Sequence, residues 1–237
     1  VMARGAGFSQ EAVVEARTSF LVPASMSYEE AGALPVAIST MHDAIVTHGR
    51  IQPGGRVLVH AATSGVGVTG VQLAAAMGAS TIFATSRSAD KLSVLTGHLG
   101  SLQSEMVAID TSTERFEELA SDIDVIVDNV GASVLEGNIA AAAITGRIVQ
   151  VGRLGGRQGT IDLDELARKR IELIGVTFRT RTEDEVAEVF QRVERDLGDR
   201  LADFRPRIAA SFPLSDIEQA FAELAQNRHV GKIVVVP

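Results

Sequence analysis

Three glycines in this sequence have the spacing of a phosphate-binding turn. Gly65, Gly67 and Gly70 form GxGxxG within "HAATSGVGVTG", between an apolar run and an alanine-rich run. After a strand and before a helix, the first glycine allows a tight turn and the second lets backbone approach a pyrophosphate. The third lets the helix pack closely on the sheet, and the helix N-terminus offers free N–H groups to the anion. The pattern predicts a dinucleotide site, with a glycine-rich turn that binds nothing as the alternative.

The stretch after the next apolar run selects the nucleotide. An NAD site usually carries Asp or Glu about 20 residues after the glycines, where it binds the ribose 2′-hydroxyl. Here "ATSRSADK" places Ser86 and Arg87 at that point, with Lys91 shortly after. A carboxylate would repel a 2′-phosphate, whereas these side chains would bind one. Asp90 fits the first turn of the following helix. We predict NADP(H), the alternative being that Arg87 is a solvated surface charge.

Composition excludes several other kinds of chemistry. The 237-residue chain has a formal net charge of -8 and contains no cysteine, which rules out disulfides, a thiol nucleophile and thiolate-bound zinc. The five histidines lack metal-ligand spacing, so no metal site is expected. No cluster of Lys or Arg is long enough for a nucleic-acid partner, and no apolar run is long enough for a membrane span. We expect a cytoplasmic protein.

Apolar runs of strand length alternate with helical stretches through the middle of the chain. Most are rich in Val and Ile without polar alternation, which is typical of parallel strands buried on both faces. The prediction is an α/β fold with a doubly wound, parallel, six-stranded sheet. The predicted strands are 56–61, 80–86, 105–110, 123–131, 146–152 and 171–178, with a helix at 183–197 and a last strand "KIVVVP". Ser215 and Glu218 predict a capping box at the start of a helix that ends near Asn227.

Two further loops are expected at the cofactor, because ligands bind at the carboxyl ends of parallel strands. "DNVG" (128–131) ends the fourth predicted strand and "VGRLGG" (151–156) ends the fifth. Their small residues would let the nicotinamide and its ribose lie against backbone. Asp128 is interpreted as a buried structural acid. His42 and His60 are interpreted as packed or hydrogen-bonded side chains, so no catalytic residue is assigned.

The ordered stretches "AGALPVAISTMHDAI", "GGRVLVHAATSGVGVTGVQLAAAMGA", "VIVDNVG", "GRIVQVG" and "HVGKIVVV" resemble the medium-chain dehydrogenase/reductase superfamily. They are most similar to its zinc-independent, quinone-oxidoreductase-like (zeta-crystallin-like) branch. The resemblance implies a Rossmann sheet with remnants of a GroES-like β domain contributed by both chain ends. Residues 1–35 would end the catalytic GroES-like domain, 36–202 would form the NADP(H)-binding Rossmann domain, and 203–237 would return to the catalytic domain. Val1 would then be a mid-protein start, with most of the substrate pocket encoded upstream.

The resemblance also assigns cofactor contacts by position. Thr40 corresponds to a threonine near the nicotinamide, and Thr111 stands where relatives often have a tyrosine. Ser64 replaces a commoner glycine and would add a hydroxyl contact. The implied pyrophosphate contacts are Ala62, Thr63, Ser64, Gly65, Val66 and Gly67. The implied 2′-phosphate contacts are Ser86, Arg87 and Lys91. The residues implied to line ribose and nicotinamide are Asn129, Val130, Val151, Gly152, Arg153 and Leu154.

The resemblance implies an NADPH-dependent oxidoreductase that delivers hydride to a quinone or conjugated enone, in which the cofactor supplies the chemistry. Three alternatives stay open. They are an enoyl-thioester reductase, a relative of zinc-type alcohol dehydrogenases, and a non-catalytic NADPH-binding module. The expected partners are a small-molecule substrate and a second copy of the chain. This homodimer would form through an edge strand at Ile171–Thr180, because an apolar edge strand is usually covered or paired.

Overall fold

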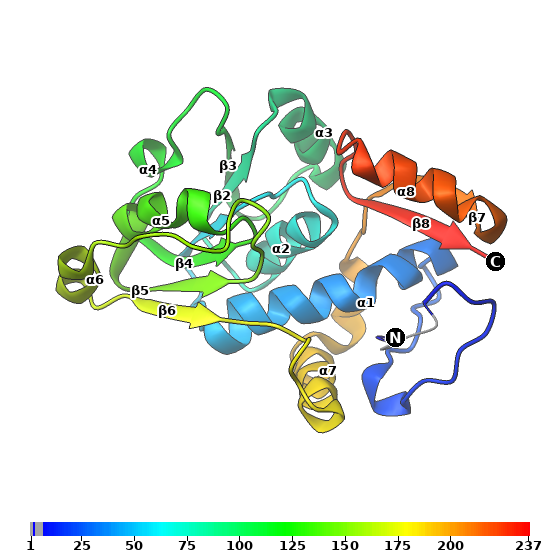
Figure 1. Ribbon diagram of the computed structural model, residues 1–237. Coiled ribbons are helices and arrows are strands. Elements are labelled where there is room, and N and C mark those ends of the chain that lie inside the picture. Colours follow the sequence, from blue (N-terminus) through cyan, green and yellow to red (C-terminus); the bar gives the residue numbers. More distant parts are fainter. Residues whose placement is uncertain (1, 3–6) are drawn as a thin grey trace.

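The computed structural model describes residues 2 and 7–237 and contains a six-stranded and a two-stranded β-sheet (Figure 1). All six strands of the larger sheet are parallel, in the order β3-β2-β1-β4-β5-β6. This arrangement confirms the predicted doubly wound α/β fold. The strands are β1 (Arg56–Val59), β2 (Thr81–Ser86), β3 (Glu105–Asp110), β4 (Ile123–Asp128), β5 (Ala142–Gln150) and β6 (Glu172–Gly175).

The strand order creates one crevice at the carboxyl edge of the sheet. The chain first runs outward from β1 through β2 to β3, and then crosses back to place β4 on the other side of β1. The connections after β1 and β4 therefore leave the sheet in opposite directions. This reversal is where dinucleotides bind in open α/β sheets.

Helices cover both faces of the sheet because both faces are apolar. Val57 and Val59 of β1 pack into one core, while Leu58 between them packs into the other. The first core is covered by α1 (Tyr28–His42), α2 (Gly65–Ala76), α3 (Ala89–Leu99) and α7 (Glu183–Leu197). The second core is covered by α4 (Phe116–Leu119), α5 (Leu135–Ala141) and α6 (Leu163–Lys169). Strands buried on both faces explain the missing polar alternation in the sequence.

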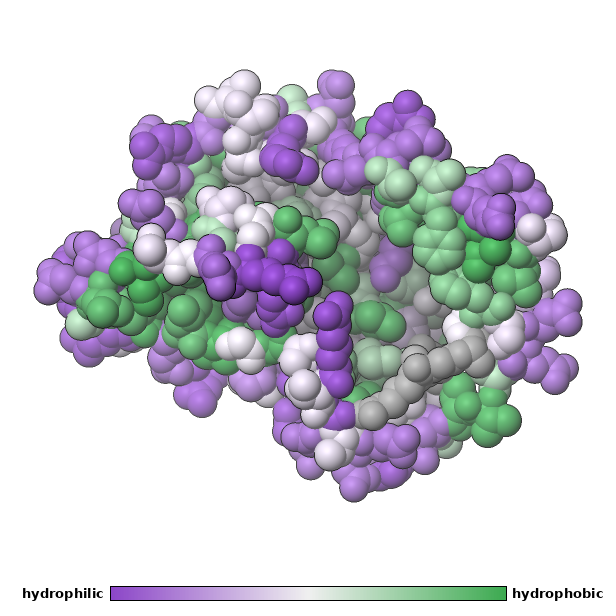
Figure 2. Space-filling model, in the orientation of Figure 1, coloured by the Kyte–Doolittle hydropathy of each residue, from purple (hydrophilic) through white to green (hydrophobic). Residues whose placement is uncertain are grey.

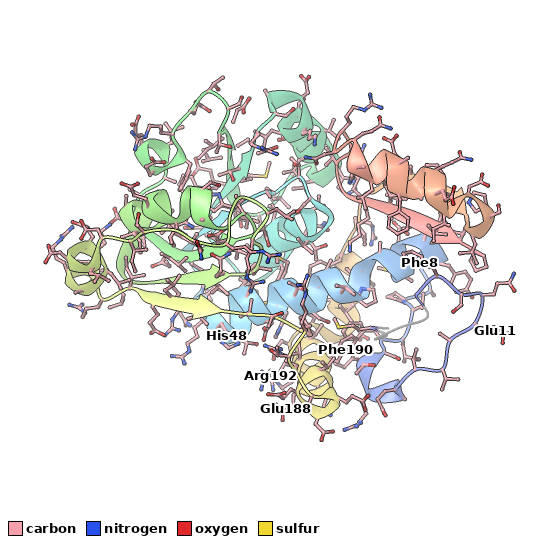
Figure 3. All side chains as sticks on the ribbon, viewed as in Figure 1. Phe8, Glu11, His48, Glu188, Phe190 and Arg192 are labelled. Carbon is pink, nitrogen blue, oxygen red and sulfur yellow. The ribbon has the colours of Figure 1, made fainter. Side chains whose placement is uncertain are left out.

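The second sheet comes from the end of the chain. Strands β7 (Ile208–Pro213) and β8 (Lys232–Val236) pair in parallel and are joined by α8 (Ile217–Ala225). Phe8 lies edge-on to Phe221 of α8, with ring centroids 5.6 Å apart. Phe20 stacks on Phe190 of α7, with ring centroids 4.5 Å apart; Figure 3 labels Phe190. The described early residues thus contact the C-terminal elements, whereas Val1 and its expected mid-protein position lie outside the described residues.

The predicted start of α8 and the predicted length of the edge strand are wrong. Ser215 does not cap α8, because it lies inside a 3-10 turn, Leu214–Asp216, that moves the helix start to Ile217. Its hydroxyl instead donates to the Asp216 carboxylate, at 3.0 Å. The predicted strand across Ile171–Thr180 is also too long. β6 pairs with β5 over only four residues before the chain turns away toward α7, although β6 is the edge strand, as expected.

The starts of α1 and α7 follow local side-chain chemistry. Capping boxes open α1 through Ser27 and Glu30, and α7 through Thr182 and Glu185. Helix α1 continues through the expected domain boundary between residues 35 and 36.

Candidate dinucleotide site

The turn from β1 into α2 carries the glycine pattern. Ser64 is the N-cap of α2, and its hydroxyl accepts a hydrogen bond from the Gly67 N–H at 3.1 Å. The tight turn is made by Ala61, whose φ is 49°, whereas Gly65 does not adopt a positive φ. The role expected for Gly65 in the turn is therefore wrong. Helix α2 still begins here, and its first N–H groups lack partners within the helix.

Each glycine of the pattern is required by a close approach. A Cβ on Gly67 would lie 2.3 Å from the Ala61 carbonyl oxygen, so this glycine lets the loop fold against its own helix. A Cβ on Gly70 would lie 2.7 Å from the sulfur of Met41 in α1. Gly70 therefore brings α2 close to α1 more than to the sheet. A Cβ on Gly65 would lie 2.4 Å from Cγ of Lys232, at the start of β8.

The end of β2 gathers the residues predicted to bind the 2′-phosphate. Ser86 is buried, and its hydroxyl lies 3.2 Å from that of Thr63 in the glycine-rich loop. Arg87 is exposed and forms no ion pair within the described part of the chain. Lys91 reaches the Asn227 carbonyl oxygen, and burial and the nearby Arg87 both lower the pKa of Lys91. Hydroxyls and two mutually repelling cations at one strand end are suited to a phosphate.

The loops after β4 and β5 interlock on the other side of the crevice. The Asp128 carbonyl oxygen accepts hydrogen bonds from the N–H groups of Val151 and Gly152, at 2.8 and 2.9 Å. The Gly155 N–H donates to the Val130 carbonyl oxygen at 2.8 Å. A Cβ on Gly152 would lie only 2.0 Å from the Asn129 carbonyl oxygen. The structure thus brings the predicted nicotinamide-side segments together, while Arg153 and Leu154 are exposed at the loop surface.

Asn129 leaves an acceptor unused at this junction. Its side-chain amide donates to the His60 carbonyl oxygen at 2.9 Å. Its Oδ1 is buried and has no hydrogen-bond partner among the described residues. A buried acceptor without a partner is costly, and a ribose hydroxyl is a donor of the required kind. Together with the glycine-lined loops, this atom supports the fit of a dinucleotide.

A buried polar chain underlies both halves of the site. Asp128 accepts hydrogen bonds from the Val130 and Gly131 N–H groups, at 2.8 and 2.7 Å, and from the Asn138 amide at 3.1 Å. Because Asn138 donates to Asp128, its oxygen must accept from His60 Nε2, at 2.7 Å. Nδ1 of His60 is then the acceptor for the Thr85 hydroxyl, at 2.9 Å. The chain of donors thus runs from β2 to the loop after β4.

The same burial shifts the pKa values of the titratable side chains in this hydrogen-bonded series. Burial raises the pKa of Asp128 to about 6 and lowers the pKa of His60 to about 4. Both side chains are buried and hydrogen-bonded, as the sequence suggested. His42 is likewise fully buried and lies 3.0 Å from Asp196 of α7.

Two residues assigned by resemblance take local roles. The Thr40 hydroxyl donates to the Val36 carbonyl oxygen within α1, at 2.6 Å, so its contact with nicotinamide stays a prediction. The N–H and hydroxyl of Thr111 both donate to the Ser86 carbonyl oxygen, at 2.8 and 3.2 Å. Thr111 therefore lies beside the predicted 2′-phosphate site.

The C-terminal segment is the part of the site that the sequence did not assign. The Gly231 N–H donates to the Thr63 carbonyl oxygen at 2.9 Å, and Gly231 forms a bridge with Ser64. Lys232 then passes over Gly65. Burial, and after it the positive charge of Lys91, lower the pKa of His229. The surface is hollowed between the six-stranded unit and these C-terminal elements (Figure 2). The sequence signal for this part of the site is the pair of basic residues in "HVGKIVVV", His229 and Lys232.

Neither a metal-binding cluster nor a membrane-spanning helix is found among the described residues. No three His, Asp or Glu side chains among them are grouped to hold a metal ion, and the sequence has no cysteine. These residues therefore do not fit a zinc site. None of the described helices combines the length and the apolar character that a membrane span requires.

The strand order, the glycine-rich turn and the crevice define a Rossmann-type dinucleotide-binding domain. Residues 103–235 match the family model described as zinc-binding dehydrogenase. The chain belongs to this family, within the medium-chain dehydrogenase/reductase superfamily. The resemblance inferred from the sequence is thereby confirmed.

The similar proteins include a polyketide synthase and quinone oxidoreductases. The chain is 29% identical to a highly reducing polyketide synthase of Cordyceps militaris over 91% of this chain and 9% of that protein. It is 26% identical to the quinone oxidoreductase-like protein 2 homolog of Nematostella vectensis, over 99% of this chain and 65% of that protein. The quinone oxidoreductase of Thermus thermophilus, also solved with NADPH, superimposes with a TM-score of 0.78 at 27% identity, over 92% of this chain and 69% of that one. This chain therefore spans less than two thirds of both curated relatives.

Proposed function

We propose that this chain binds NADP(H) and forms the cofactor-binding part of a reductase that transfers hydride from NADPH to a quinone or conjugated enone. The observation that carries the proposal is the end of β2, where Ser86, Arg87 and Lys91 stand without the carboxylate of an NAD site. The likeness to a quinone oxidoreductase solved with NADPH supports the same choice of nucleotide. Similarity to the quinone oxidoreductase-like protein of Nematostella supports the substrate class.

The residues of the chain would bind and orient the cofactor. The N-terminus of α2 would hold the pyrophosphate, while Arg87 and Lys91 would neutralise the 2′-phosphate. The interlocked loops at Asn129 and Gly152 offer a backbone surface on which the nicotinamide ring can lie. When bound, the reduced nicotinamide supplies the hydride. No proton donor is assigned to the described residues, and the chain's contribution is orientation and exclusion of water.

The proposal is tested by titrating the chain with NADPH and NADH and following nucleotide fluorescence. We expect NADPH to bind at least about tenfold more tightly, because a charge-assisted contact to the 2′-phosphate contributes about 1.5 kcal/mol or more. Equal affinities would contradict the predicted preference. Oxidation of NADPH in the presence of a quinone then tests the reaction itself.

Reduction of an enoyl thioester is the second candidate. It is favoured by similarity to a highly reducing polyketide synthase along 91% of this chain. The two candidates share the cofactor site and differ in the electrophile. Parallel assays with a quinone and with a trans-2-enoyl thioester separate them, because only the true substrate class should increase NADPH oxidation with saturation.

We also propose that the chain forms a homodimer through β6. This strand is the edge of the sheet next to β5, and Leu173 on it is 43% exposed. An apolar edge offers unpaired backbone groups to a second copy. Light scattering should report a dimer that Leu173→Lys dissociates, whereas Val94→Lys, at a similarly exposed site on α3, should leave it intact. A monomeric mass for the unaltered chain would refute the proposal.

A further inference from the structure

The start of β8 places a lysine side chain directly over the glycine-rich turn. An added Cβ on Gly65 would meet Cγ, Cδ and Cε of Lys232 at 2.4, 3.0 and 2.8 Å. The aliphatic stem of Lys232 therefore crosses the backbone of the first helical residue of α2. Gly65 is thus required by this crossing.

The position of Lys232 is held by backbone contacts. The Gly231 N–H donates to the Thr63 carbonyl oxygen at 2.9 Å, and the Lys232 N–H donates to the Arg207 carbonyl oxygen at 2.8 Å. Gly231 itself has a φ of 86° and packs tightly, since an added Cβ would lie 2.2 Å from the Arg207 carbonyl oxygen. The path of the chain into β8 is therefore closely defined, which places the Cα of Lys232 beside Gly65.

The ammonium group of Lys232 lacks a counter-charge. It has no ion pair or hydrogen bond to any described residue. Burial lowers the pKa of Lys232, and no neighbouring carboxylate opposes that shift. Of the chain's three lysines, Lys91 and Lys169 both donate to backbone carbonyl oxygens. A partly buried ammonium without a counter-charge is stabilised when an anion binds beside it.

We infer that Lys232 is a pyrophosphate-binding residue, which makes the dinucleotide site a joint product of the α2 N-terminus and the C-terminal strand β8. The inference rests on the proposed binding of NADP(H). Lys232 lies over Gly65 at the helix N-terminus, whereas the predicted 2′-phosphate contacts are at the end of β2. The helix N-terminus and the ammonium then act on the same negative charge from two sides.

The test compares Lys232→Met with Arg87→Met in direct binding of NADPH and NADH, without an activity readout. Methionine keeps an unbranched stem over Gly65 and removes the charge. Since the pyrophosphate is common to both nucleotides, Lys232→Met should weaken NADPH and NADH by the same factor, about tenfold to a hundredfold. Arg87→Met should weaken NADPH alone. Lys232→Arg, which retains the charge, should bind both nucleotides more tightly than Lys232→Met.

Arg192→Met is the matched control, since Arg192 lies on α7 and pairs there with Glu188 at 3.1 Å (Figure 3). It should bind both nucleotides as the unaltered chain does. Thermal unfolding of each variant separates loss of contact from loss of fold, and Lys232→Arg supplies the comparison if Lys232→Met unfolds. Unchanged binding by Lys232→Met, or loss of NADPH binding alone, overturns the inference and leaves the proposed function standing. An unaltered chain that binds neither nucleotide refutes the proposed function, and the inference with it.

Discussion

The two halves of the large sheet offer a dinucleotide different kinds of surface. The β1–β2–β3 half ends in charged and hydroxyl side chains, among them Ser86, Arg87 and Lys91. At the carboxyl edge of the β4–β5–β6 half, the surface consists mainly of backbone, because the loops containing Asn129 and Gly152 contact each other directly. The charged end of the cofactor would therefore be recognised by individual side chains. The nicotinamide end would instead be recognised by loop shape.

Burial accounts for this division. Arg87 is exposed and has no ion pair among the described residues, so it remains available to an anion. Asp128 is fully buried, and its charge is disfavoured there, which restricts it to holding the loop through hydrogen bonds. Substitutions in each half of the sheet test whether one half acts through side-chain charge and the other through backbone shape.

Gly152→Ala tests whether the second half depends on backbone contact. The new Cβ would lie 2.0 Å from the Asn129 carbonyl oxygen, and backbone on both sides cannot yield cheaply. We expect a loss of about 3 kcal/mol in the free energy of unfolding, measured by urea denaturation. Gly97→Ala in α3 is the control, since its Cβ would meet no atom within 4 Å. That change should stabilise the chain by about 0.5–1 kcal/mol. Equal effects of the two substitutions would refute the shape argument.

Arg87→Glu tests whether the first half acts through charge. A carboxylate at the end of β2 would repel the 2′-phosphate and could accept from a ribose 2′-hydroxyl. We expect NADPH affinity to fall about a hundredfold while NADH affinity stays equal or rises, measured by fluorescence titration. Equal losses of affinity for NADPH and NADH would contradict recognition of the 2′-phosphate by the charge of Arg87.

Asp128→Asn tests the buried acid beneath the second half. The pKa of Asp128 in the folded chain is about 6, above the ordinary value of about 3.9, so the folded state binds the proton more tightly than the unfolded state does. Relative to the variant, the unaltered chain should therefore lose about 2–3 kcal/mol of stability as the pH rises from 4 to 6, with a constant difference above that range. Denaturation at several pH values measures this difference. A pH-independent difference would show that Asp128 is not titrating in this range.

Ser64→Ala gives the smallest expected effect, since the Ser64 hydroxyl caps α2 by accepting from the Gly67 N–H. Loss of this cap should lower the free energy of unfolding by about 1 kcal/mol, whereas Ser64→Gly should lower it by only a few tenths of a kcal/mol. Thermal unfolding measures both. If Ser64→Ala weakens nucleotide binding while leaving stability unchanged, the hydroxyl contacts the cofactor, as the resemblance implied.

The sequence alone was sufficient for the fold class and for the family of the chain. Strand β3 and helix α7 have the boundaries that apolar patterning predicted, because local hydrophobic periodicity reflects burial on the sheet. The spacing from Gly65 to Arg87 predicted the side-chain chemistry at the end of β2, because both residues belong to one βαβ unit. Helix boundaries were less predictable where a local turn competes with the helix cap. The 3-10 turn before α8, for example, includes Ser215, which therefore does not cap that helix.

Only the tertiary structure decided which distant residues meet. Neighbouring sequence gives no indication that His60, Thr85, Asn138 and Asp128 form one hydrogen-bonded chain, since they come from four separate elements. Nor does it show that Lys232 crosses Gly65, because that contact depends on where the second sheet docks. Short-range patterns determine strands, helices and turns. The docking of elements far apart in the sequence determines the electrostatic partners of the site.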